Sequence, residues 1–344
     1  MTSTQRLANL LRVIPVLLVA EAATGQSFEA AFEGPSADRW NYGFNVTPGT
    51  RPVASVFGYT GDLYEFDDRD GQVIIAFDTS TVIAPGAGAD RYVVDTFTIE
   101  LMLADPLAGG YDPTVDDWRT HLASADPLYL PDADPGRPIE LYATGFRNRV
   151  DEADWTESSD FSPVGPFGEG VRNAFAAQCM PDGQLLDVSN CISEEFTATP
   201  IAIGTADGWS PGEELPEGTS LTFTFDGDDP AAAAWLSRSL NEGRLLFSVS
   251  SLIEAEQEGG DFIDLYMREN PLVQVGVRQA ATLVIAGEIS TGCDAEGDFD
   301  HDCVIGGGDL GIFLAFWGTD NPETDLNHDG VTNGTDLGIL LSLF

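Results

Sequence analysis

Two twelve-residue stretches near the end of the chain carry oxygen-bearing side chains at the spacing of a calcium-binding loop. Calcium takes about six to eight oxygen ligands, and alternate residues of such a loop wrap around one ion. In "DLNHDGVTNGTD" the sixth position is Gly330, which suits the sharp turn that this loop requires. The predicted calcium ligands of this stretch are Asp325, Asn327, Asp329, the backbone carbonyl of Val331, Asn333 and Asp336.

The other stretch, "DFDHDCVIGGGD", begins 27 residues earlier, at Asp298. Its turn position holds Cys303 in place of glycine, and Gly306 supplies no side-chain oxygen at the ninth position. We expect two calcium ions, one in each loop. The histidines at the fourth positions, His301 and His328, point to solvent in such loops and are not predicted ligands. The predicted ligands of the earlier loop are Asp298, Asp300, Asp302, the carbonyl of Val304 and Asp309.

Each loop runs directly into an apolar helical segment, "DLGIFLAFW" or "DLGILLSLF". The two loop–helix segments align along their length, which indicates an internal duplication. This duplication, with Asp at the last loop position and no long helix before either loop, resembles a dockerin domain of type I. The resemblance covers residues 290–344 and implies a small helical, EF-hand-like module that folds around calcium. It also implies docking onto a cohesin domain of a scaffold protein, and such modules are often carried by polysaccharide-degrading enzymes.

Two features of the repeats depart from the family pattern. Where the family uses a Ser-Thr pair for cohesin recognition, the chain has Gly307-Gly308 and Gly334-Thr335, and neither helix carries Lys or Arg. We therefore expect the partner to be a cohesin-like or another extracellular protein, with cover by the chain's own preceding domain as the alternative. The residues expected to form this partner surface are Phe313, Phe316, Trp317, Leu340 and Phe344.

The long part of the chain before these repeats, residues 26–289, consists of short apolar runs separated by Gly, Pro, Asp and Ser. Their Val, Ile, Thr, Phe and Tyr content is typical of strands. A helix is expected over 229–243, because Asp229 can cap it, Pro230 suits its first turn and Gly243 its end. We predict a mainly β fold, a jelly-roll-like β-sandwich with one helix. The clearest predicted strands cover 72–80, 91–103, 138–146, 219–226, 244–252 and 272–287.

The N-terminal residues have the pattern of a removable secretion signal. Residues 1–12 contain two Arg and no acidic residue, and the apolar run that follows, Val13–Ala20, is too short to span a bilayer. Small residues after Ala20 suit cleavage, so we predict a signal peptide over 1–25 and an extracellular or periplasmic mature protein. A buried N-terminal helix is the alternative, which Pro15 disfavours.

Four cysteines in a secreted chain favour disulfides, and three pairings are possible. We expect Cys179–Cys191 and Cys293–Cys303, because each of these pairs closes a short loop. The second bond would also hold the earlier calcium loop when calcium is scarce.

The charge of the chain is strongly negative, with 57 acidic residues against 15 basic ones and a net charge of −42. Such a field repels nucleic acid and anionic lipid, attracts cations, and favours a monomer. No other stretch is long and apolar enough to predict a membrane span. The simplest explanation is adaptation to a salty or calcium-rich medium, where ions screen self-repulsion.

The predicted sandwich shows no catalytic motif. His121 could act in Ser-His-Asp catalysis, but the chain has no G-x-S-x-G nucleophile elbow to pair with it. The stretch "DDRDG" at 67–71 could bind calcium through Asp68 and Asp70, but such a stretch is more often a polar turn. Tryptophans in polar loops can stack on sugar rings, although each is more often a cover for the core. The predicted sugar platform consists of Trp118, Trp155 and Trp209.

Three functions are therefore open. The first is a non-catalytic sandwich carried on a dockerin-like module for extracellular assembly or attachment. The second is a polysaccharide-degrading enzyme of the glycoside hydrolase class, which requires two carboxylates facing each other in a cleft. The third is a carbohydrate-binding module.

Overall fold

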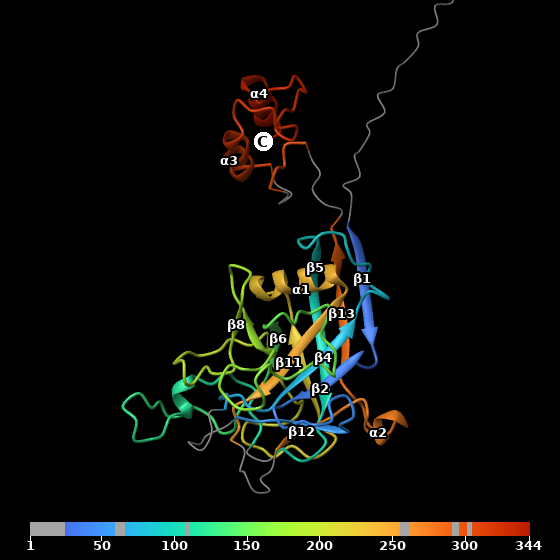
Figure 1. Ribbon diagram of the computed structural model, residues 1–344, viewed down its shortest axis with the longest axis vertical. Coiled ribbons are helices and arrows are strands. Elements are labelled where there is room, and N and C mark those ends of the chain that lie inside the picture. The colour runs from blue at the N-terminus through green and yellow to red at the C-terminus, as the bar shows by residue number, and fades with distance from the viewer. Residues whose placement is uncertain (1–24, 59–65, 108–109, 255–261, 291–295, 301–304) are drawn as a thin grey trace, which may run out of the picture.

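The computed structural model describes residues 25–58, 66–107, 110–254, 262–290, 296–300 and 305–344 (Figure 1). The predicted signal peptide up to residue 24 lies outside these ranges, as do Cys293, Asp302, Cys303 and Val304. Among the described residues, no helix has the length and apolar character needed to cross a lipid bilayer.

The fold is mainly β, as predicted, with antiparallel sheets in the arrangement of a β-sandwich. In order, the four-stranded sheet contains β1 (Gln26–Phe32), β13 (Thr282–Ile289), β5 (Tyr92–Met102) and β10 (Ser220–Phe225). The larger sheet contains β2 (Ala37–Asn41), β4 (Gln72–Asp78), β11 (Arg244–Ser251), β6 (Ile139–Phe146), β7 (Ala174–Cys179) and β8 (Leu185–Asp187), with β9 (Ala202–Ile203) beside β6. A small third sheet pairs β3 (Val53–Val56) with β12 (Ile263–Tyr266).

The two large sheets share one hydrophobic core, because alternate residues of their strands point inward. The rings of Phe97 on β5 and Phe247 on β11 lie 5.3 Å apart, and neither side chain is exposed to solvent by more than 1%. Phe247 also meets the ring of Trp235 edge-on at 5.2 Å. Trp235 belongs to the predicted helix, which closes this core against β5 and β11.

That helix, α1 (Pro230–Glu242), begins and ends where its capping residues predict. The Asp229 side chain accepts the N–H of Ala231, and Gly243 adopts a left-handed φ of 83° at the C-terminal end. The strand predicted over 272–287 is wrong in its first part. Residues Pro271–Gln274 form a short helix, α2, because Asn270 caps Leu272 and Pro271 fixes the first helical φ. The strand there is β13, which begins at Thr282.

The predicted disulfide between Cys179 and Cys191 is wrong, since both are free buried thiols. Cys179 ends β7 with its side chain in the core between the sheets. Cys191 packs with Tyr142 and Ala176 on the other side of the larger sheet. A short sequence separation therefore does not bring the two sulfur atoms together. Burial raises the pKa of the Cys179 thiol to about 12, which keeps it protonated and unreactive.

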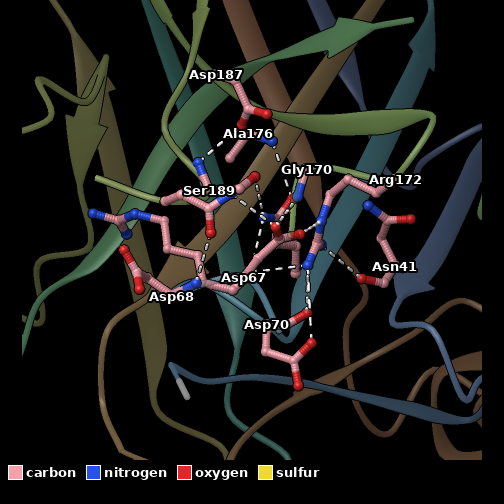
Figure 2. A network of polar contacts seen from close by, with 12 residues as sticks. Asn41, Asp67, Asp68, Asp70, Gly170, Arg172, Ala176, Asp187 and Ser189 are labelled. Carbon is pink, nitrogen blue, oxygen red and sulfur yellow. Dashed lines mark hydrogen bonds and ion pairs between the residues drawn. The ribbon is translucent and has the colours of Figure 1, made fainter. Parts of the chain in front are cut away.

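A buried ion pair joins the loops at the end of the larger sheet (Figure 2). Arg172, 1% exposed, donates from Nε to Asp67 Oδ2 at 2.5 Å. Asp67 also accepts the backbone N–H of Gly170 at 2.6 Å and the amide of Asn190 at 2.9 Å. The remaining guanidinium donors reach the backbone carbonyls of Asn41, Arg69 and Asp70. Because the guanidinium is matched on every side, this network fixes four separate segments to one another.

The contacts around this network argue against a calcium site formed by Asp68 and Asp70 in "DDRDG". Asp68 turns away and accepts the backbone N–H groups of Ile192 and Ser193, each at 2.8 Å. Asp70 is buried, with its carboxylate 3.9 Å from the Arg172 guanidinium. The two carboxylates therefore serve different loops of the sandwich.

We predict that Asp70→Asn flattens the dependence of stability on pH. The pKa of Asp70 is raised to about 7. Burial is the main cause, Arg172 acts against it by lowering the pKa, and the Asp67 carboxylate adds to it. Because this pKa exceeds the unfolded value, the contribution of Asp70 is present at low pH and is lost as pH rises through about 7. Denaturant unfolding between about pH 4 and 7, the range between the unfolded and folded pKa values, should show a slope reduced by at most about 1.4 kcal/mol per pH unit in Asp70→Asn. Equal slopes in Asp70→Asn and the wild-type protein contradict the prediction, and Asp68→Asn serves as control.

The C-terminal repeats form a separate helical unit with its own core (Figure 1). Their helices are α3 (Gly307–Ala315) and α4 (Gly334–Ser342), as the apolar segments predicted. The fully buried Phe313 and Leu340 occupy equivalent positions, and Phe299 and Leu326 form a second equivalent pair. The duplication in the sequence is thus repeated in the packing.

Candidate metal centre in the C-terminal repeats

The first repeat brings three of its predicted ligands together. Carboxylate oxygens of Asp298, Asp300 and Asp309 all lie within 4.8 Å of one another. Asp298 and Asp309 are buried, with exposures of 3% and 0%, whereas Asp300 is exposed. Such a cluster of hard oxygen atoms is suited to calcium.

Asp309 is held in place by the backbone of its own loop. Its Oδ1 accepts the N–H of Phe299 at 2.6 Å, and its Oδ2 accepts that of Gly306 at 2.7 Å. Burial raises the pKa of Asp309, but these backbone N–H groups and that of Asp300 outweigh burial and lower the pKa below its usual value. The carboxylate is therefore ionised at neutral pH, and Oδ2, which accepts only the Gly306 N–H, keeps a lone pair for a metal.

The second repeat holds its last aspartate by equivalent contacts. Asp336 accepts the N–H of Asn327 at 3.0 Å and that of Asn333 at 2.8 Å. Burial raises the pKa of Asp336, and again backbone N–H groups outweigh burial, so that the pKa lies below its usual value. Asn333 caps α4 by accepting the N–H of Thr335 at 2.8 Å. The loop ends where the helix begins, which fixes Asp336 in the first turn.

The front of the second loop has the predicted turn. Gly330 has a φ of 93°, a left-handed conformation that glycine adopts without strain, and its N–H lies 2.7 Å from Asp325 Oδ2. Asp325 Oδ1 accepts the N–H of Asp329 at 3.1 Å. The predicted ligands Asn327 and Asn333 both donate to Asp329 Oδ2, at 3.1 and 3.4 Å. The Val331 carbonyl accepts from Asn333 at 2.8 Å, so the polar groups of this loop bond to one another.

The first repeat also explains one departure from the family pattern. A Cβ at Gly308 would lie 2.1 Å from Asp300 Oδ2, far inside any normal contact. A serine or threonine in this position is therefore incompatible with the observed place of Asp300. The glycine leaves room for the Asp300 carboxylate beside Asp298 and Asp309.

The predicted partner surface is wrong for two of its five residues. Phe313 and Leu340 are fully buried, because they form the small core between the repeats. Phe316, Trp317 and Phe344 are exposed by 38%, 48% and 58%. Three further exposed residues were not predicted. The repeat spacing of 27 residues could have indicated them, because the six exposed residues form three equivalent pairs. The six exposed residues are Leu314 with Leu341, Phe316 with Leu343, and Trp317 with Phe344.

The predicted sugar platform is wrong for Trp155. This side chain is 1% exposed and packs behind the larger sheet, under the guanidinium of Arg244 at 5.7 Å. Trp118 lies at the start of η1 (Trp118–His121) and is half-buried, and Trp209 is 37% exposed. A stacking role is therefore open to Trp209 and Trp118.

Two cavities, of about 430 and 600 Å³, were not predicted from the sequence. The larger cavity, of about 600 Å³, is lined by Glu152 and Glu242 together with Arg238 and Trp235. Burial raises the pKa of Glu152 to about 7, opposed by Ser239 and Arg244. A carboxyl group that is partly protonated at neutral pH is able to act as a general acid.

Comparison of the chain with models of known protein families and with curated proteins finds no match.

Proposed function

We propose that the protein is a secreted calcium-binding protein in which a non-catalytic β-sandwich is carried on a dockerin-like module. The observation that carries this proposal is the pair of loop–helix repeats around one core. In each repeat an aspartate at the last loop position, Asp309 or Asp336, accepts backbone N–H groups of its loop and caps the helix that follows. Two calcium ions would be held by the predicted ligands of the two loops, and the module would serve extracellular assembly or attachment.

The strand order supports a jelly roll for the carrier domain. Eight strands in chain order are β1, β4, β5, β6, β7, β10, β11 and β13. The first, eighth, third and sixth of them form one sheet, and the second, seventh, fourth and fifth form the core of the other. This order is that of two interleaved Greek keys. A domain of this kind presents loops at its ends while its core stays closed.

The exposed apolar residues of the repeats support a protein partner. Trp317 and Phe344 are large side chains exposed beside a very small core, and aromatic anchors dominate the binding energy of many interfaces. Helices α3 and α4 of the repeats carry no basic residue. The partner therefore binds by apolar contact, and it is a cohesin-like domain or another extracellular protein.

Binding to purified cohesin domains tests the partner. We expect the full-length protein to be retained on immobilised cohesin in calcium and released by chelator. Trp317→Ser should reduce retention by at least about tenfold, the loss expected for an aromatic anchor. Trp209→Ser, which changes another exposed tryptophan, in the sandwich, should have no effect. Absence of calcium-dependent retention, or equal retention of both variants, contradicts a cohesin-like partner.

A polysaccharide-degrading enzyme is the second candidate, favoured by the cavity that Glu152 and Glu242 share. Its general acid would be Glu152, whose pKa burial raises to about 7. Polysaccharide hydrolysis by the purified protein, abolished in Glu152→Gln, would replace the non-catalytic proposal. Glycan binding without hydrolysis, weakened in Trp209→Ser, would assign carbohydrate binding to the sandwich.

A further inference from the structure

A second group of acidic residues lies in the long connection between β5 and β6. The only regular element of its described residues is the short helix η1. Residues near its two ends lie in close contact. A Cβ at Gly136 would lie only 2.9 Å from the carbonyl oxygens of both Gly110 and Tyr111. This contact brings Asp134 back beside Asp112.

Three carboxylates gather where the ends of the connection meet. Oxygen atoms of Asp112, Asp116 and Asp134 all lie within 4.8 Å of one another. Asp112 is 2% exposed, and the Asp116 side chain is 5% exposed. The Thr114 hydroxyl lies 2.8 Å from Asp112 Oδ1 and 3.1 Å from Asp134 Oδ2, so it fixes these two side chains.

Two buried polar atoms at this place have no hydrogen-bond partner among the described residues. One is Asp112 Oδ2, and the other is His121 Nε2. The His121 side chain is 5% exposed and stands 3.9 Å from Asp116 Oδ2, beyond hydrogen-bond distance. A buried carboxylate oxygen without a donor costs free energy unless a cation meets it.

The basic groups of the connection do not balance these charges. Arg137 donates to Asp116 at 2.8 Å and to Asp132 at 2.6 Å, and these ion pairs do not include Asp112 or Asp134. The carboxylates of Asp112 and Asp134 are therefore without a basic partner among the ion pairs of the described residues.

A comparable acidic group elsewhere has one arginine in contact with all three of its carboxylates. Asp38, Glu157 and Glu269 also lie within 4.8 Å of one another. The Arg268 guanidinium stands at 2.7 Å from Glu157, 2.8 Å from Glu269 and 3.8 Å from Asp38. An arginine therefore takes the place of a metal there, whereas Asp112 and Asp134 lack this partner among the described ion pairs.

We propose that Asp112, Asp116 and Asp134 bind a calcium ion that ties together the two ends of the connection between β5 and β6. The donor atoms are carboxylate oxygens, which calcium prefers, and the unpartnered Asp112 Oδ2 is the buried ligand. The ion offsets the repulsion among the three carboxylates and fixes the base of a long loop. This site is separate from the C-terminal loops.

Calorimetric titration of the full-length protein with calcium, after treatment with chelator, tests this site. In a background with Asp309→Asn and Asp336→Asn, which disables the C-terminal loops, one equivalent of calcium should still bind. Adding Asp112→Asn and Asp134→Asn should abolish this equivalent. Adding Asp207→Asn instead, an exposed aspartate in another loop, should leave it unchanged.

The melting temperature gives a second measurement that does not depend on stoichiometry. Asp134→Asn alone should remove the calcium-induced rise that remains in the background protein, without lowering the melting temperature in chelator. Retention of the equivalent or of the rise in the variants overturns the proposal. A background protein that binds no calcium overturns it as well, whatever the C-terminal loops do in the wild-type chain.

Discussion

Replacing Arg172 with methionine is expected to lower the free energy of unfolding of the sandwich by about 3–5 kcal/mol. The change leaves the Asp67 carboxylate buried at 2% side-chain exposure without its cation. It also removes the donors to the carbonyls of Asn41, Arg69 and Asp70. Breaking one side of a buried pair costs more than the pair itself contributes, because the remaining charge is left without a counter-charge.

Chemical denaturation followed by tryptophan fluorescence measures this loss. Arg278→Met is the matched control, since Arg278 forms a solvent-exposed ion pair with Glu217 at 3.0 Å and its loss should change little. The double variant Asp67→Asn with Arg172→Met should be more stable than Arg172→Met alone, because no unpaired buried charge remains. Equal effects of Arg172→Met and Arg278→Met would show that the network of Figure 2 does not hold the loops.

The second large effect is expected in the C-terminal unit, where Phe313→Ala should prevent folding even in saturating calcium. Removing a buried phenyl group costs about 3–5 kcal/mol. A unit of this size has a total stability of similar magnitude, at about 0.05–0.15 kcal/mol per residue. Phe313 is fully buried and stacks near Phe299 with ring centroids 6.3 Å apart.

Hydrogen exchange read by mass spectrometry resolves this effect within the full-length chain. Peptides from α3 and α4 should lose protection in Phe313→Ala, while peptides from the sandwich should keep it. Phe316→Ala is the control, because Phe316 lies at the end of the same helix and is 38% exposed. Unchanged protection of α3 and α4 in Phe313→Ala would exclude a core shared by the repeats.

The sequence predicted the regular elements well where local signals were strong. Asp229, Pro230 and Gly243 marked the ends of α1, and alternating apolar residues marked β10. The apolar run after Asn270 was misinterpreted as a strand throughout, because its Val and Leu residues outweighed the helix-start signal of Asn270 and Pro271. Capping residues decide the conformation of such short segments better than apolar content does.

Long-range contacts could not be predicted from local patterns. Asp67 and Arg172 are far apart in the chain and meet only because the loops at one end of the larger sheet converge. The opposite faces of that sheet separate Cys179 from Cys191, although their short spacing favoured a bond. The acidic cluster of Asp112, Asp116 and Asp134 could not be predicted for the same reason. In a chain with 57 acidic residues, sequence spacing alone does not indicate which carboxylates lie together.

The repeats are the exception, because duplication supplies a long-range signal. Equivalent positions in the two repeats predicted both loops and both helices, and the structure places equivalent residues in equivalent contacts. The error concerned Phe313 and Leu340, which were assigned to the surface. A helix on its own shows an apolar face without indicating which residues the other repeat covers.

Hydrogen exchange of the wild-type chain in calcium and in chelator tests the central claim most directly, namely that the repeats fold around calcium. We expect peptides covering α3 and α4 to be protected in calcium and to exchange freely in chelator, while the strands of the sandwich keep their protection. Asp336→Asn should shift the calcium concentration needed for protection of α4 upward, and Asp320→Asn, an exposed aspartate between the loops, should not. Equal protection of α3 and α4 with calcium and with chelator would contradict the account.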